Sequence, residues 1–175
     1  MKKAGVCFFT WICILFLVLS CSSDKKYKGG KLFAGPAAAD IVNYVNQGLI
    51  SISELEQKSL ERYASVTGEN ATTNQRLFEE LRDFVIPTYK RFLQGLKEIS
   101  PENEEVRQVH TIYIGAAESM LEGFQSIMVG SKNGDISIIK QGNKKLEEGR
   151  TKTEQWRKAL DDLYKKHGVA TVEDK

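Results

Sequence analysis

The chain has 175 residues, a length that suits a single domain, and 41% of them are hydrophobic. Its 25 lysine and arginine residues nearly balance 23 aspartate and glutamate residues, giving a formal net charge of +2. Nucleic-acid-binding domains carry a clear basic excess, so this balance argues against a nucleic-acid partner. The chain has three cysteines.

Residues 1–20 have the layout of a secretory signal peptide. The basic pair Lys2-Lys3 precedes an apolar run over residues 4–19 that contains a single polar side chain. This run is shorter than the roughly 20 apolar residues that cross a bilayer, which favours an export signal that is removed. A signal anchor is the alternative, because the uncharged stretch continues to Ser23. The lysines after that stretch outnumber Lys2 and Lys3, which disfavours an anchor with its N-terminus inside.

The end of this run, Val18-Leu19-Ser20-Cys21, resembles the lipobox of bacterial lipoprotein precursors. That pattern has a branched apolar residue three places before an invariant cysteine and a small residue directly before it; Leu19 is less usual than Ala or Ser. The resemblance implies cleavage between Ser20 and Cys21 and attachment of acyl chains such as palmitate to Cys21. The other two cysteines, both within residues 1–20, would leave with the signal peptide, so no disulfide or cysteine metal site is expected.

The residue after Cys21 bears on the membrane that such a lipoprotein reaches. In enteric-type bacteria Asp at this place favours retention in the inner membrane, whereas Ser22 resembles the outer-membrane class. The resemblance therefore implies the outer membrane in a Gram-negative bacterium. In a Gram-positive bacterium it implies the outer face of the plasma membrane.

Residues 21–35 are expected to form a flexible tether after the acylated cysteine. Serines, lysines and the pair Gly29-Gly30 cannot sustain a helix or bury much surface. The four lysines of this segment either lie on anionic headgroups, at about 1 kcal/mol each, or only keep a spacer solvated.

From Pro36 onward, apolar residues recur at spacings of three and four, which predicts four amphipathic helices. The first ends at Thr67-Gly68. The second starts with the capping-box spacing of Thr72 and Gln75 and is expected to kink near Pro87. The third starts at Ser100-Pro101-Glu102, with Ser as the N-cap and Pro in the first helical position.

Asn133 or Asp135 is expected to cap the fourth helix, and Gly168 to end it. Its predicted inner face includes Ile136, Thr153 and Trp156. Short connections between long helices predict an all-α, antiparallel, up-down-up-down four-helix bundle over residues 36–168, followed by a C-terminal tail at 169–175.

Few residues of the predicted bundle suggest chemistry. His110 is the one histidine inside a predicted helix, and a haem or metal site would pair it with Met120 or Met128. The residue three places before it is Arg107, however, so the Glu-x-x-His signature of di-iron bundles is missing. A structural or rim histidine is therefore the favoured interpretation.

For the other polar residues on the predicted helices, a structural or solvated role is also favoured over catalysis. Glu118 and Glu122 share a helix face, but acid–base catalysis needs a pocket that separates their pKa values, so two solvated carboxylates are favoured. Ser119 and Ser126 lack an obvious histidine–carboxylate partner. Asn143, like Thr153, interrupts the apolar seam of the fourth helix. It either sets the register or faces a partner or a small polar ligand. We expect no catalytic residue, no metal and no cofactor.

Glycines within the predicted helices each cost up to about 1 kcal/mol relative to Ala, so they call for an explanation. They mark close helix approach, a cleft, or no constraint at all. The residues concerned are Gly95, Gly115, Gly123, Gly142 and Gly149.

Together these features predict a lipid-anchored, extracytoplasmic helical-bundle lipoprotein that is not an enzyme. Its mature region resembles the small helical lipoproteins of unknown role found in bacteria. We expect it to act as a binding, adaptor or structural component of the bacterial envelope, held to the membrane by acyl chains on Cys21 and contacting an envelope protein. The alternative is a sensory bundle that holds a small ligand or haem between its helices.

Overall fold

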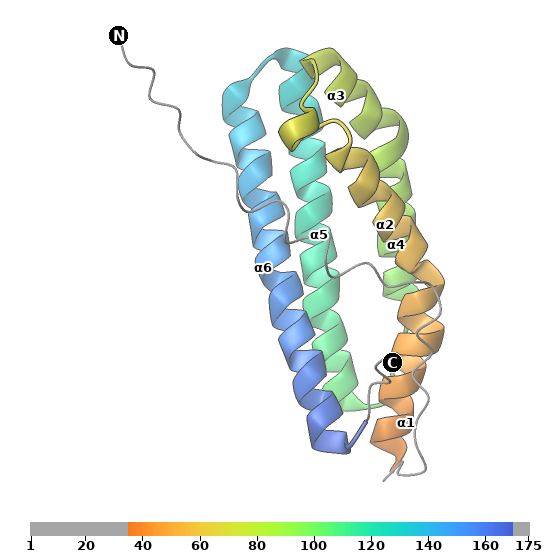
Figure 1. Cartoon of the computed structure of the whole chain (residues 1–175). Helices are drawn as coiled ribbons and strands as arrows, with labels where there is room; N and C mark the ends of the chain where they lie inside the picture. The colour runs from red at the N-terminus through yellow and green to blue at the C-terminus, as the bar shows by residue number, and fades with distance from the viewer. Residues whose placement is uncertain (1–34, 170–175) are drawn as a thin grey trace.

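The computed structural model describes residues 35–169, and this part of the chain is all-helical, as predicted. Four helical rods pack side by side in a bundle (Figure 1). The first two rods contain π-helical segments, η2 and η4, and a short 3₁₀ turn, η3, lies between these rods. In chain order the elements are α1 (Pro36–Asn43), η2 (Tyr44–Leu49), α2 (Ile50–Ala64), η3 (Gly68–Asn70), α3 (Asn74–Glu80), η4 (Leu81–Val85), α4 (Ile86–Glu98), α5 (Glu104–Asn133) and α6 (Ile136–His167).

The second rod starts one residue later than predicted. The hydroxyl of Thr73, not of Thr72, accepts the backbone N–H of Arg76, at 3.2 Å. Farther along this rod, η4 ends directly before α4, in whose first turn Pro87 lies. Pro87 has no backbone N–H, and its ring crowds the turn before it. The wider π-helical turn of η4 provides room for this ring.

The prediction that Ser100-Pro101-Glu102 starts the third rod is wrong. Asn103 is the N-cap of α5, and its side-chain oxygen accepts the N–H groups of Glu105 and Val106. The reason is a tertiary contact, because the carboxylate of Asp40 in α1 accepts the N–H groups of Glu102 and Asn103. These donors are therefore satisfied from outside the helix, and residues 99–103 form the connection.

Local capping residues form the end of the third rod and both ends of the fourth. Gly134 ends α5 in the left-handed conformation (φ 66°), and the next residue, Asp135, caps α6. Gly168 ends α6 in the same way (φ 64°), as predicted. Val169, placed in the tail by sequence, donates its N–H to the Tyr164 carbonyl at 2.9 Å and is buried, so the bundle includes it.

Glycines bring the backbones of α5 and α6 into direct contact. A Cβ atom at Gly142 would lie 2.8 Å from the Gly123 carbonyl oxygen and 2.9 Å from the Ile127 nitrogen. A Cβ atom at Gly149 would lie 3.1 Å from the Ala116 carbonyl oxygen. Gly142 and Gly149 are one heptad apart on α6, as Ala116 and Gly123 are on α5, so the small residues repeat along one seam.

Of the three explanations left open by the sequence, close helix approach is therefore the one that applies to Gly123, Gly142 and Gly149. It also holds for Gly95, where a Cβ atom would lie 2.8 Å from the Ile52 side chain. Gly115 differs, because a Cβ atom there would meet nothing within 4 Å.

Two apolar clusters form the core. The smaller cluster lies at the end of the bundle where α1 begins and α6 ends, and it contains Ala38, Ile41, Tyr44, Val45, Val106, Val109, Leu160, Leu163, Tyr164 and Val169. The larger one joins η4 and α4 to α5 and α6 and includes Leu81, Val85, Tyr89, Phe92, Leu96, Tyr113, Phe124, Ile127 and Leu146. One prediction for α6 is wrong, because Ile136, expected inside, is 67% exposed. Asn143 is exposed, which excludes the alternative that it sets a buried register.

The glycine seam predicts opposite effects for two Gly→Ala substitutions. Gly142→Ala is expected to destabilise the protein by about 1–3 kcal/mol, because its methyl group overlaps backbone atoms that have no room to move. Gly115→Ala is the matched control and is expected to stabilise by up to ~1 kcal/mol, since it gains helix propensity without a clash. Urea unfolding of both variants measures the difference. A loss of stability in Gly115→Ala equal to that in Gly142→Ala would contradict the backbone contact.

Candidate functional site

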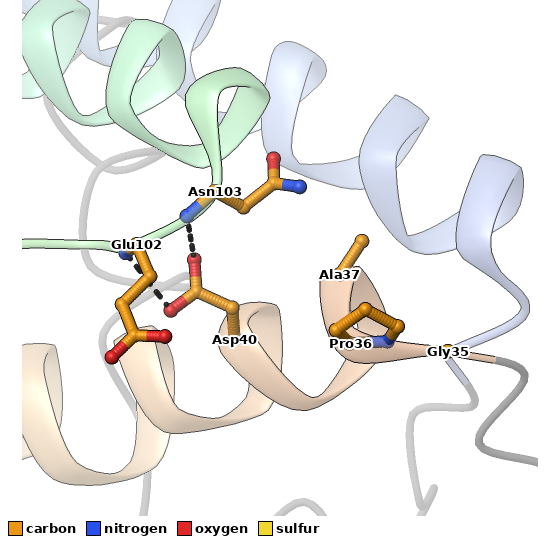
Figure 2. A pocket seen from close by; sticks show the side chains of 6 residues that line it. All are labelled: Gly35, Pro36, Ala37, Asp40, Glu102 and Asn103. Carbon is orange, nitrogen blue, oxygen red and sulfur yellow. Dashed lines mark hydrogen bonds between the residues drawn. The ribbon is translucent and has the colours of Figure 1, made fainter.

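The predicted lipidation and cleavage residues, Cys21 and Ser20, lie outside the described residues 35–169. Along the sequence, the described site that follows them first is the beginning of α1. A shallow pocket of about 320 Å³ opens there, lined by Gly35, Pro36, Ala37, Asp40, Glu102 and Asn103 (Figure 2).

Asp40 supplies the carboxylate of this pocket and connects α1 to the start of α5. Its carboxylate accepts the Asn103 N–H at 2.9 Å and the Glu102 N–H at 3.2 Å, as the dashed lines in Figure 2 show. Because the negative charge lies just before the first turn of α5, it also favours the positive end of that helix dipole. Asp40, which lies one turn into α1, therefore fastens this helix to the start of α5.

A second group of polar side chains lies inside the bundle, between the first rod, α5 and α6. We call it the aromatic–carboxyl cluster, and its members are Tyr44, Glu56, His110, Tyr113 and Trp156. The Tyr113 hydroxyl donates to the Glu56 carboxyl group at 2.7 Å, and the Tyr113 ring stacks on Trp156 with centroids 4.1 Å apart. The Tyr44 hydroxyl lies 3.2 Å from Nδ1 of His110, and their rings meet edge to face.

Burial controls the ionisation of this cluster. It raises the pKa of Glu56 to about 7, although the hydroxyl of Tyr113 and the charge of Arg157 oppose this shift. Burial also lowers the pKa of His110 and raises the pKa of Tyr113 well above its ordinary value. The imidazole and the phenol are therefore neutral at pH 7, and Glu56 is the cluster member that titrates near neutrality.

His110 is a buried structural histidine and is not brought together with either predicted methionine partner. It is 5% exposed and contacts Tyr44 at the end of the bundle where α1 begins. Met120 lies ten residues farther along α5, which is about 15 Å, and packs against Gly149. Met128, still farther along, packs against the larger apolar cluster.

Glu118 and Glu122 point to different partners and do not form a carboxylate pair. Glu118 pairs with Lys97 of α4 at 2.6 Å, and Glu122 pairs with Lys145 of α6 at 3.1 Å. Both carboxylates are about half exposed, so these are surface ion pairs of the kind that contribute little to stability.

Ser119 has a cationic partner that the sequence did not reveal. Its hydroxyl donates to the Gly115 carbonyl at 3.0 Å and accepts Lys152 Nζ of α6 at 2.8 Å. Ser119 is 5% exposed, so the contact bridges the two helices inside their groove. The hydroxyl of Thr153, half-buried, donates to the Gly149 carbonyl of its own helix at 3.0 Å.

Sequence reasoning missed Asp40 and Glu56, for different reasons. Glu56 follows Ile52 by four residues and precedes Ser59 by three, so the spacing of the inner stripe would have placed it on the buried face. The role of Asp40 depends on a contact with residues more than 60 positions away, and no local signal indicates it.

The described residues 35–169 hold no group of three or more histidine, cysteine, aspartate or glutamate side chains placed to bind a metal ion. In the same range, no helix has both the length and the apolar character needed to cross a bilayer. Comparisons with protein family models, with curated proteins and with solved structures found no match to this chain.

The raised pKa of Glu56 predicts how stability depends on pH. A carboxyl group with a higher pKa in the folded than in the unfolded state favours folding below its ordinary pKa, and this contribution is lost as the pH rises towards 7. From pH 4.5 to pH 8 we therefore expect Glu56 to remove about 1–3 kcal/mol of stability. Urea unfolding across this range should show a smaller loss in Glu56→Gln, whose side chain stays neutral. An identical pH dependence in both proteins would contradict this assignment.

The position of Asp40 predicts a cost for its removal. Asp40→Ala leaves two backbone N–H groups without their acceptor, which should cost about 1–2 kcal/mol. Asp162→Ala is the control, because it removes only a surface ion pair with Lys158 and should change stability by less than ~0.5 kcal/mol. Thermal unfolding distinguishes the two. Equal shifts in melting temperature would show that Asp40 does not fasten α1 to α5.

Proposed function

We propose that this chain is an exported lipoprotein, anchored through acyl chains on Cys21, whose helical bundle acts as a binding, adaptor or structural component of the bacterial envelope. In this proposal residues 1–20 are removed, residues 21–35 form the tether, and the rods follow an up-down-up-down order with a bend near Pro87. In a Gram-negative bacterium the proposal places the protein in the outer membrane, because Ser22 follows the cysteine. In a Gram-positive bacterium it places the protein on the outer face of the plasma membrane.

The observation that carries the proposal is the way the chain enters the bundle. The first turn of α1 follows directly after the lipobox and tether region, and the smaller apolar cluster packs this turn against the end of α6. Asp40, in the next turn of α1, holds this helix to the start of α5. A force or restraint applied through the N-terminal segment therefore reaches three rods at one end of the bundle, which suits an anchored protein.

This arrangement also gives the bundle a direction relative to the membrane. The turn between α5 and α6 and the start of α3 lie at the end opposite the start of α1 (Figure 1). Residues 22–34 span at most about 45 Å when fully extended, and the 32 residues of α6 span about 48 Å. The partner of such an adaptor would therefore lie in the membrane or within ~100 Å of its surface.

Metabolic labelling tests the anchor. Cells that express the chain and grow with an alkyne fatty acid should label the wild-type protein, and Cys21→Ala should lose the label because it lacks the acceptor thiol. Cys7→Ala and Cys13→Ala are matched controls, since these cysteines lie in the segment that the proposal removes, and both should label normally. Equal labelling of the wild type and of Cys21→Ala would overturn the anchor.

Crosslinking in intact envelopes extends the same experiment to the adaptor role. A photoreactive residue at position 136, which is 67% exposed near the turn opposite the anchored end, should give a discrete protein adduct in the wild-type background. The Cys21→Ala background should lose the adduct, because the bundle is no longer held at the membrane. Adducts of equal yield in both backgrounds would show that the contact does not depend on the anchor.

A further inference from the structure

The pocket at the start of α1 is bordered by the first residues that the structure describes. Gly35 and Pro36 line it, together with Ala37 of the same turn (Figure 2). Gly35 has a φ of +126°, a backbone angle that other residues rarely adopt, so the chain enters α1 through a turn that requires glycine. Because consecutive Cα atoms are about 3.8 Å apart, the residues directly before Gly35 can reach the pocket without any rearrangement of the bundle.

The pocket carries negative charge that no cation balances in the described part of the chain. The carboxylate of Asp40 accepts two backbone N–H groups and forms no ion pair there. The carboxylate of Glu102 is exposed and has no cationic partner among the described residues. Arg107 donates to the backbone carbonyl of Glu102, but its guanidinium group is paired with the carboxylate of Glu104. The pocket therefore suits an occupant that brings a positive charge.

The segment that precedes Gly35 has this chemistry. Lys31 is a cation, and the next two residues, Leu32 and Phe33, are apolar like Pro36 and Ala37. Four residues separate Lys31 from Gly35, so the main chain between them spans at most about 14 Å. A segment linked so closely acts at a high effective concentration, which allows even a shallow pocket to hold it.

The charge of the pocket disfavours two other occupants. An anionic lipid surface would be repelled by the carboxylates of Asp40 and Glu102. In a two-fold symmetric dimer formed through this end of the bundle, the same carboxylates of the two copies would face one another. A basic and apolar segment of the same chain meets neither objection.

We propose that residues 31–33 dock on this pocket, with the Lys31 ammonium group paired with Glu102 and the Phe33 ring covering Pro36 and Ala37. Docking shortens the tether, because residues 22–30 then remain free and span at most about 30 Å, against about 45 Å for residues 22–34. This effect on reach rests on the proposed anchor at Cys21. The docking itself does not, since it involves only residues after the anchor.

Carbodiimide crosslinking tests the docking on the full chain in detergent micelles. The reagent adds no spacer, so it joins a lysine to a carboxylate only where the two groups touch. Mass spectrometry should find Lys31 joined mainly to Glu102, and much less to Glu98 or Glu104, which are exposed carboxylates within four residues of Glu102. A mixture of ¹⁵N-labelled and unlabelled chains should give this crosslink within single chains.

Two variants of the same segment make the test specific. Phe33→Ser should lower the yield of the Lys31–Glu102 crosslink about 10-fold, because covering the pocket with the aromatic ring supplies most of the affinity. Tyr27→Ser is the matched control, since it removes an aromatic ring that lies before the docking residues, and it should retain the yield. Cys21→Ala should also retain it, so a failed anchor leaves this test intact.

Four outcomes would overturn the docking. Absence of the Lys31–Glu102 crosslink is the first, and equal yields at Glu98, Glu102 and Glu104, which would indicate undirected encounters, are the second. A crosslink formed only between labelled and unlabelled chains would assign the pocket to a second copy. An unchanged yield in Phe33→Ser, or an equal loss in Tyr27→Ser, would show that Phe33 does not cover the pocket.

Discussion

The backbone contact between α5 and α6 is the constraint from which the rest of the bundle follows. A helix pair normally keeps its axes apart by the thickness of two layers of side chains. Here Gly142 fits against the carbonyl of Gly123, and Gly149 against that of Ala116, so this layer is missing. The pair gains close van der Waals contact along its length, and the first two rods pack against it.

The tight α5–α6 pair contrasts with the side of the bundle where α2 faces α6. There the helices reach one another through long side chains: the charge of Arg157 acts on Glu56, and that of Arg150 acts on Tyr63. Polar groups buried between helices destabilise the fold unless they are paired. When they are paired, they specify which helix faces pack together. The aromatic–carboxyl cluster meets this requirement in part, through the hydrogen bonds of Glu56 with Tyr113 and of Tyr44 with Nδ1 of His110. Nε2 of His110 and Nε1 of Trp156 are buried without a hydrogen-bond partner.

The end of the bundle that the proposed tether enters is organised differently. The smaller apolar cluster and Asp40 join α1, α5 and α6 near the point where the described chain begins. A bundle fastened firmly at this end offers the persistent attachment that the proposed anchored adaptor would need.

Much of this architecture could be predicted from local sequence. The spacing of apolar residues indicated four helices, and the capping signals at Asp135 and Gly168 were correct because each acts on backbone groups within its own turn. The glycines on α5 and α6 were recognised as candidates for close approach, although the sequence alone could not separate them from Gly115, which lies beside open space. That difference depends on which helix happens to lie opposite.

What only the tertiary structure decided were the features that join distant parts of the chain. The sequence predicted Ser100 as the N-cap of the third helix, but the N-cap is Asn103. The carboxylate of Asp40 satisfies the backbone donors of Glu102 and Asn103, which local sequence assigns to the helix. Glu56 and Tyr113 are 57 residues apart, and their hydrogen bond exists only because the rods pack in this arrangement. The sequence by itself determined the helical pattern and the predicted anchor at Cys21, since periodicity, caps and the lipobox-like segment are local. Which helices contact one another depends on residues far apart in the sequence, so only the tertiary structure shows it.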